Sequence, residues 1–378
     1  MKELGLYIHI PFCESKCYYC DFISYPNKRN FIEIYVNYLI KEIKMQSEKL
    51  KNYKLKTVFI GGGTPSSIDA KYIYKILEEV YKEFNTTFLE EITIEANPNT
   101  IDENKLKLYK KSNINRISLG LQSSDNNILK RIGRTHTKEV FLKNYKLISK
   151  YGFSNINIDI MFNLPKQTLY EVEKTINFVT KLDVKHISFY SLKLEEGTPF
   201  FDKYKDDKSS LPSEDLEREM YHKGIELLKN KNFHQYEISN FHKKNYKCKH
   251  NLLYWKVKPY LGVGIGAHSN LFNERWGNEI NFTNYFKALD NNRLPIFQSE
   301  RIDKNMEMSE YVILGLRLNE GIDKRVFYKR FNVNIEKIYK SQIKKFEREG
   351  LLNNFNNRIK LTERGRDISN RVFMELLT

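Results

Sequence analysis

Short apolar runs rich in β-branched residues alternate with longer amphipathic stretches in the first half of the chain, and this alternation constrains the fold more than any other feature. The runs predict strands at residues 4–10, 57–60, 91–96, 116–119, 156–162 and 186–190, and the stretches between them predict helices at 30–50, 70–84, 102–112, 137–151 and 168–182. Strand–helix alternation at this spacing is typical of parallel βα units. We therefore expect an α/β fold, either a partial TIM-type (β/α)6 barrel with its site on the loops after the strands or a doubly wound open sheet.

The pattern changes after about residue 195. A helix is predicted at 213–231 with Ser213 as its N-cap, and a further short strand at 235–240. From about residue 300 the chain is mostly helical, and a hairpin near 351–365 resembles the wing of a winged-helix unit. We divide the chain into a barrel core at 1–200, a connecting segment at 201–299 and a smaller winged-helix-like domain at 300–378. No helix of this last part gathers arginines, so we expect it to pack rather than to bind nucleic acid.

Composition sets the broad class of the protein. The 378 residues are 40% hydrophobic, which is enough to bury a sizeable core, and no apolar run is long enough to cross a bilayer. Lys and Arg number 63 against 47 Asp and Glu, a net charge of +16 that favours anionic partners, although these residues are spread along solvated helix faces. The N-terminus enters a strand pattern without a signal peptide, and four cysteines do not form a disulfide framework. These features predict a cytoplasmic location.

Three of the four cysteines lie on one short loop after the first predicted strand. Cys13, Cys17 and Cys20 are separated by three and then two residues, so their thiolates can hold three corners of a metal centre. A structural zinc ion requires a closed set of four ligands, and no fourth Cys or His follows at the spacing of a zinc finger, although the distant Cys248 or His250 could supply one in space. A [4Fe–4S] cluster with three cysteine ligands instead leaves one iron open to an exogenous ligand.

Residues around this loop favour the iron–sulfur cluster. Tyr19 lies between the second and third cysteines, where an aromatic face can stack on a purine, and the glycines at 61–63 follow the second strand, where bare backbone can approach a ligand closely. With these features the chain resembles the radical S-adenosylmethionine (SAM) superfamily. The resemblance implies a cluster on the three cysteines, SAM on the open iron, and an electron donor such as flavodoxin or ferredoxin.

The same resemblance implies a set of SAM contacts on successive strand ends. They are Tyr7, Tyr19, Gly62, Gly63, Thr64, Glu95, Gln122, Arg134 and Asp159, of which the last four match the coproporphyrinogen-dehydrogenase-like branch. Arg134 suits the SAM carboxylate, because a guanidinium can pair with it through two hydrogen bonds. Glu95, Gln122 and Asp159 suit the ribose hydroxyls and the amino group.

Two sequence features distinguish between the members of that branch. Phe22 stands where the dehydrogenases carry a fourth cysteine, and the first strand begins by Leu4, which leaves no counterpart of the segment that covers their active site. Residues 250–255, His-Asn-Leu-Leu-Tyr-Trp, resemble the HNxxYW signature of the HemW heme chaperones, as does the glycine-rich stretch that runs to Ser269. From the residues alone, a lone histidine beside aromatic residues is more often packed and hydrogen-bonded than a metal ligand. The resemblance implies His250 as a heme ligand, with tyrosine and tryptophan as flat faces for the porphyrin. For Cys248 we favour a buried thiol over an axial thiolate or a covalent attachment point.

The resemblance therefore implies a heme chaperone that binds a [4Fe–4S] cluster, SAM and heme and passes heme to an acceptor protein. A membrane surface is compatible as a peripheral partner, and no nucleic acid is expected. One alternative is an oxygen-independent coproporphyrinogen III dehydrogenase of porphyrin biosynthesis, which decarboxylates propionate side chains with SAM. Another is a zinc- or DNA-binding module built on the C-terminal wing.

Overall fold

The computed structural model describes residues 1–377, and its main feature is one long curved sheet. The strands are β1 Lys2–Ile10, β2 Tyr53–Gly62, β3 Glu91–Ala96, β4 Arg116–Gln122, β5 Ile156–Phe162, β6 His186–Ser191, β7 His234–Gln235, β8 Asn240–His242, β9 Tyr260–Val263, β10 His268–Leu271, β11 Glu274–Asn278, β12 Ile296–Arg301, β13 Ile322–Asp323, β14 Leu352–Phe355 and β15 Arg358–Leu361. The helices are α1 Ile32–Ser47, α2 Ala70–Glu83, α3 Glu103–Lys111, α4 Asn126–Arg131, α5 Lys138–Lys150, α6 Leu169–Thr180, α7 Pro199–Tyr204, α8 Glu214–Asn230, α9 Lys249–Trp255, α10 Phe282–Asp290, α11 Lys304–Leu316, α12 Lys324–Phe331, α13 Ile335–Ile338, α14 Lys340–Arg348, α15 Glu363–Asp367 and α16 Ser369–Met374.

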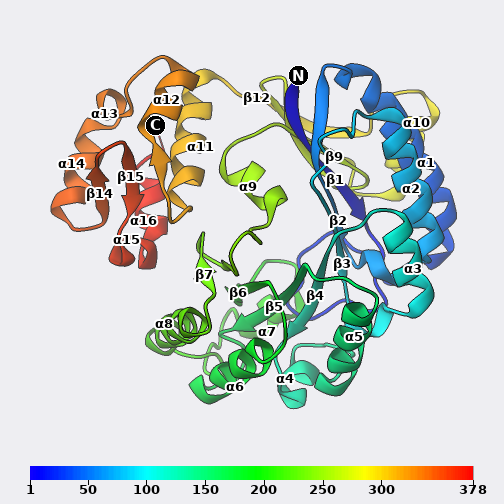
Figure 1. Cartoon of the computed structure of the whole chain (residues 1–378), viewed down its shortest axis with the longest axis horizontal. Helices are drawn as coiled ribbons and strands as arrows, with labels where there is room; N and C mark the ends of the chain where they lie inside the picture. Colours follow the sequence, from blue (N-terminus) through cyan, green and yellow to red (C-terminus); the bar gives the residue numbers. More distant parts are fainter. Residues whose placement is uncertain (378) are drawn as a thin grey trace.

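Strands β1 to β6 pair in parallel and in sequence order, and β9 pairs in parallel with β1 on the other side. A doubly wound sheet would reverse its order at an inner strand, which this sheet does not. Right-handed crossovers between successive neighbours place every connecting helix on the same face, and α1 to α6 lie along the outer side of the sheet in Figure 1. The expected partial (β/α)6 barrel is therefore confirmed, and it is open, because β7 and β12 form its two unjoined edges.

The predicted strands and helices of the barrel are present, although β2 is longer than expected, and three further elements differ from the prediction. The strand expected at 235–240 is wrong: two short antiparallel strands, β7 and β8, flank a turn in which Asn240 bonds the buried Glu237. Helix α7 falls in the expected connection, where Pro199 occupies its first turn and the Thr198 hydroxyl accepts from the backbone N–H of Phe201. Helix α4 was also not expected, although Asp125 caps its N-terminus.

The C-terminal part forms a smaller unit with its own core. Its three-stranded sheet, β13-β15-β14, packs with α11 to α16 around buried side chains such as Phe327 and Phe346. This arrangement agrees with the expected winged-helix-like domain.

The segment between the two parts adds to the barrel, because strands β9 to β12 extend the barrel sheet. The domain boundaries near 200 and 300 stay predictions. Figure 1 shows α9 in the middle of the molecule, between the barrel sheet and α11.

Within residues 1–377 no helix combines the length and the apolar character that a membrane span requires.

A buried carboxylate joins the first helix to the far end of the sheet. Glu42 of α1 accepts hydrogen bonds from the Gly264 backbone N–H at 2.8 Å, the Tyr285 hydroxyl at 2.6 Å and the Asn278 amide at 2.6 Å. Burial raises the pKa of Glu42 to about 7. These three bonds fix the turn after β9, the end of β11 and helix α10 against α1.

We expect Glu42→Ala to lower the free energy of unfolding by about 3 kcal/mol, because it leaves several buried donors without an acceptor. Urea denaturation at constant pH measures the change. Glu48→Ala, at an exposed carboxylate just beyond the end of α1, is the matched control and should change stability little.

The wild type should also lose stability as pH rises from about 5 to 7, because Glu42 ionises more easily in the unfolded chain. An equal pH slope in Glu42→Ala would contradict this role.

Candidate functional site

Most of the residues singled out in the sequence meet around one cavity of about 140 Å³ at the carboxyl ends of the parallel strands. Those that line it are Cys13, Cys17, Tyr19, Cys20, Gly62, Gly63, Thr64, Glu95, Gln122, Arg134 and Asp159. They come from β2 to β5 or from loops that follow β1, β2 and β4, which is where a barrel of this kind carries its site. We call this space the cysteine cavity. Tyr7 and His250 do not line it.

The two residues that follow β2, Gly63 and Thr64, hold the cysteine loop by direct backbone contact. The N–H groups of Gly63 and Thr64 donate to the carbonyls of Ile10 and Phe12 at 2.9 and 2.8 Å. A Cβ atom on Gly63 would lie 2.7 Å from the Phe12 oxygen and 3.0 Å from the Cys13 sulfur. Only glycine permits this approach, so the spacing between β2 and the loop depends on that residue.

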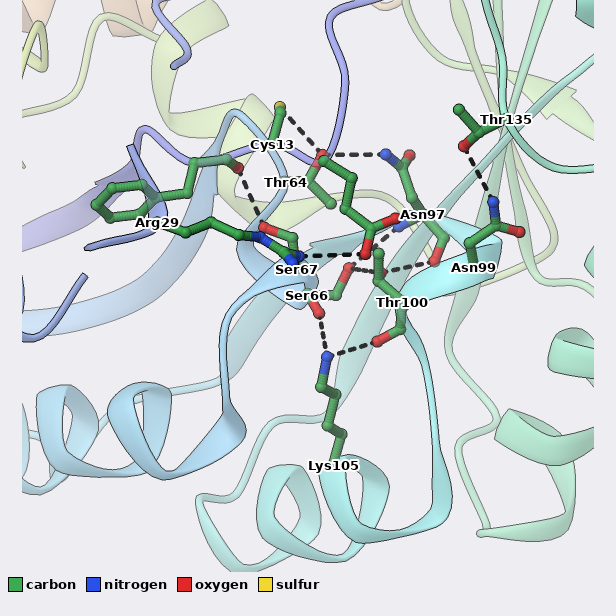
Figure 2. Close-up of polar contacts among 12 residues, drawn as sticks. Cys13, Arg29, Thr64, Ser66, Ser67, Asn97, Asn99, Thr100, Lys105 and Thr135 are labelled. Carbon is green, nitrogen blue, oxygen red and sulfur yellow. Dashed lines mark hydrogen bonds and ion pairs between the residues drawn. The ribbon is translucent and has the colours of Figure 1, made fainter. Parts of the chain in front are cut away.

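A chain of hydrogen bonds connects two of the cysteines through the strand ends. The Cys13 thiol lies 3.3 Å from the Thr64 hydroxyl, which accepts from the Asn97 amide at 3.0 Å (Figure 2). The Asn97 oxygen accepts from Arg134 at 2.8 Å, and Arg134 also donates to the Cys17 sulfur at 3.6 Å. The sequence reasoning did not select Asn97, although it directly follows β3 and lies two residues after Glu95.

Two carboxyl groups face the inner side of the cavity. The Gly62 N–H donates to Glu95 at 3.2 Å, and Asp159 accepts from Ser118 at 3.1 Å and from Asn157 at 2.7 Å. Burial, and then the charge of Asp159, raises the pKa of Glu95 to about 8. Near neutral pH, Glu95 is therefore mostly protonated until a cation approaches it.

A bulge at the end of β4 turns Gln122 towards the cavity. The register between β4 and β5 shifts between Gly120 and Gln122, and Gln122 has a φ of 68°. A non-glycine residue in this left-handed region costs conformational energy, which functional sites commonly tolerate. The Gln122 carbonyl oxygen accepts from the Tyr190 hydroxyl at 3.1 Å, which leaves its amide group for another partner.

The cysteine donors suit an iron–sulfur cluster by their chemistry. Burial raises the pKa of Cys13, and raises that of Cys20 to about 11, so a bound metal has to displace their protons. Across residues 1–377 no three His, Cys, Asp or Glu side chains form a preformed ion site. Three soft thiols on one loop nevertheless match the ligand preference of iron–sulfur clusters.

Tyr7 lies in a second and larger cavity of about 720 Å³, which we call the aromatic cavity. Aromatic side chains from the barrel and from the end of α9 line it, among them Tyr254, Trp255 and Tyr260. Phe22, which stands where the dehydrogenases carry a fourth cysteine, lines both cavities and is 64% exposed. The two cavities are therefore neighbours along the cysteine loop.

His250 lies in the protein interior. It is 1% exposed, and its two ring nitrogens lie 2.7 Å from the Thr57 hydroxyl and 2.8 Å from the Tyr254 hydroxyl. Burial lowers the pKa of His250 to about 3, so the ring is neutral and its one donor and one acceptor are both used. Its role as a heme ligand stays a prediction, and in this conformation ligation would require one of these hydrogen bonds to break.

Glu91 of β3 anchors the start of α9. Its carboxylate accepts from the backbone N–H groups of Lys249 and His250, each at 3.0 Å. The neighbouring Cys248 is fully buried, and burial raises its pKa to about 12. Cys248 therefore has the surroundings of an inert thiol.

Comparison with known proteins agrees with this geometry. The model of the radical SAM superfamily matches residues 7–179, and that of the HemN C-terminal domain matches residues 302–368. The chain is 34% identical to heme chaperone HemW of Bacillus subtilis over 97% of both chains. It is 36% identical to heme chaperone HemW of Lactococcus lactis, covering 100% of this chain and 98% of the relative.

The chain belongs to the HemW family. Its fold is shared with the coproporphyrinogen III oxidase HemN of Escherichia coli, a radical SAM enzyme, at a TM-score of 0.88 and 20% identity over 100% of this chain and 90% of that one. At this identity the likeness concerns the fold alone. The HemW relatives cover the barrel, α9 and the C-terminal unit together.

Burial should make the four thiols of the metal-free chain differ in reactivity. We expect iodoacetamide to label Cys17 and Cys20 at least about 100-fold faster than Cys248, because Cys17 and Cys20 are partly exposed whereas Cys248 is fully buried and inaccessible to the reagent. Mass spectrometry of peptides at successive times measures each rate. Cys248→Ala should leave the other rates unchanged. Fast labelling of Cys248 in the folded chain would show that its site is open.

Proposed function

We propose that this chain is a heme chaperone, which binds a [4Fe–4S] cluster, SAM and heme and passes heme to an acceptor protein. Relatives named heme chaperones match it over nearly their whole length. The observation that carries the proposal is the position of α9. The helix with the HNxxYW sequence ends at the aromatic cavity, and that cavity adjoins the cysteine cavity at Phe22. At about 720 Å³ it lies within the range of ~300–1,000 Å³ usual for pockets that bind small molecules.

In this proposal Cys13, Cys17 and Cys20 hold the cluster, which supplies an electron to the SAM sulfonium when both are bound. Arg134 uses three of its five N–H donors on Cys17, Asn97 and the Gly120 carbonyl, so others remain for the SAM carboxylate.

The remaining polar groups of the cysteine cavity suit the rest of SAM. Glu95, beside the Gly62 N–H, suits the amino group, and Gln122 and Asp159 suit the ribose hydroxyls. Tyr19, which lines the same cavity, suits the adenine ring.

A second candidate is the SAM-dependent decarboxylation of coproporphyrinogen III, because the fold is shared with HemN. Phe22 in place of a fourth cysteine weighs against it.

Three expectations from the sequence stay predictions. They are contact with an electron donor such as flavodoxin or ferredoxin, contact with a membrane surface, and a cytoplasmic location.

Anaerobic titration of the cluster-reconstituted chain with ferric heme tests the proposal, with the Soret band as the readout. We expect saturable binding of one heme per chain, followed by loss of the bound spectrum when an excess of an apo-heme protein is added. Absence of saturable binding would overturn the chaperone function. Decarboxylation of coproporphyrinogen III in the presence of SAM and a reductant would support the second candidate instead.

The pKa of Glu95 predicts how SAM affinity depends on pH. The positive charge of SAM near Glu95 favours the ionised carboxylate, so binding below pH 8 requires the Glu95 carboxyl group to lose its proton. We expect the affinity to rise by roughly tenfold per pH unit up to about pH 8 and then to level off. Equilibrium binding of labelled SAM to the reconstituted chain measures this. Glu95→Gln should bind weakly at every pH, and an unchanged slope in that variant would exclude Glu95 as the titrating group.

A further inference from the structure

The walls of the aromatic cavity come from four separate segments. The cysteine loop contributes residues 21–23, α9 contributes Tyr254 and Trp255, the sheet contributes residues such as Tyr260 and His268, and α11 contributes Ile313 and Leu314. Apolar side chains dominate the lining, and the rings of Tyr254 and Tyr260 meet edge to face at 4.7 Å between centroids, with Trp255 lining the same cavity. Such a surface suits a planar tetrapyrrole, and its iron then needs a donor atom within the cavity.

Three histidines lie in or next to this cavity, and two of them have both ring nitrogens engaged. His9 bonds the Tyr7 hydroxyl at 3.0 Å and the Ile23 carbonyl at 2.8 Å. His250 bonds Thr57 and Tyr254 and does not itself line the cavity. Ligation of iron by either ring would leave a buried polar group without its partner, which is unfavourable.

The third histidine, His268, differs from the other two. It lines the cavity, is exposed, and its ring makes no hydrogen bond to any residue in the described range 1–377. His268 starts β10 directly opposite Gly277 of β11. Its ring lies over Gly277, only 3.0 Å from where a Cβ atom on that glycine would be, so a side chain at position 277 would take the space of the imidazole. The strand pairing thus fixes the imidazole beside the cavity without using either nitrogen.

We propose that heme occupies the aromatic cavity with a ring nitrogen of His268 as an axial ligand, and that His250 is a positioning residue. His250 holds the Tyr254 hydroxyl, and Glu91 holds the N-terminus of the same short helix. The two contacts together keep Tyr254 and Trp255 against the cavity. This inference rests on the proposed heme function and assigns the iron ligand to the residue whose nitrogens are free, rather than to the histidine of the HNxxYW sequence.

Ferric heme titrations of the full chain, His268→Ala, His250→Gln and His234→Ala test the assignment. Resonance Raman and electron paramagnetic resonance spectra report the axial ligand independently of affinity. We expect His268→Ala to bind heme at least about tenfold more weakly and to lose the histidine-ligated spectrum, which added imidazole should restore. His250→Gln should keep that spectrum on the heme that it binds. His234→Ala, at an exposed histidine that does not line the cavity, should behave as the wild type.

The outcomes separate this inference from the proposed function. If the wild type binds heme and His268→Ala keeps the histidine-ligated spectrum, the assignment to His268 is wrong while the chaperone function stands. Loss of that spectrum in His250→Gln, with unchanged circular dichroism, would show that His250 is the iron ligand. If the wild type binds no heme saturably, the proposed function itself fails.

Discussion

The contact between the end of β2 and the cysteine loop is the constraint on which the site depends. Gly63 and Thr64 extend the β1–β2 pairing beyond the last strand residues by two backbone hydrogen bonds, so the loop begins in a fixed place. A side chain at Gly63 would push Phe12 and Cys13 away. Because Thr64 also contacts the Cys13 thiol and Asn97, the same segment sets the position of Arg134 across the cavity.

Much of the barrel could be predicted because strands buried on both faces leave continuous apolar runs and helices buried on one face leave a helical period in the sequence. Strand β2 begins earlier than expected, since Lys54 and Lys56 interrupt its apolar run, yet Lys54 pairs with Glu3 of β1 and Lys56 lies at a bulge within the pairing. Helix α7 and the β7–β8 turn were not predicted, because each is too short for a period to develop. Caps such as Thr198 and Asp125 were the available signals.

The candidate site, too, could be predicted only in part. Residues that follow successive parallel strands must converge, so the SAM contacts could be placed from motif and strand order together. The surroundings of His250 could not, because Thr57 and Tyr254 bond it from different elements and no local pattern reports that both of its nitrogens are used. His268 was visible only as part of a glycine-rich stretch. The position of its ring over Gly277, with neither ring nitrogen hydrogen-bonded, follows from strand pairing that no local sequence pattern reports.

The aromatic cavity lies between two bodies that have separate hydrophobic cores, because Tyr7 and Tyr260 belong to the barrel whereas Ile313 and Leu314 belong to α11. The width of the cavity therefore depends on how the C-terminal unit packs against the barrel, and not on the packing within either core. Arg275 of β11 and Glu310 of α11 form an ion pair across these two walls. Salt screens such partly exposed pairs, so a rise in ionic strength should weaken this contact between the two walls.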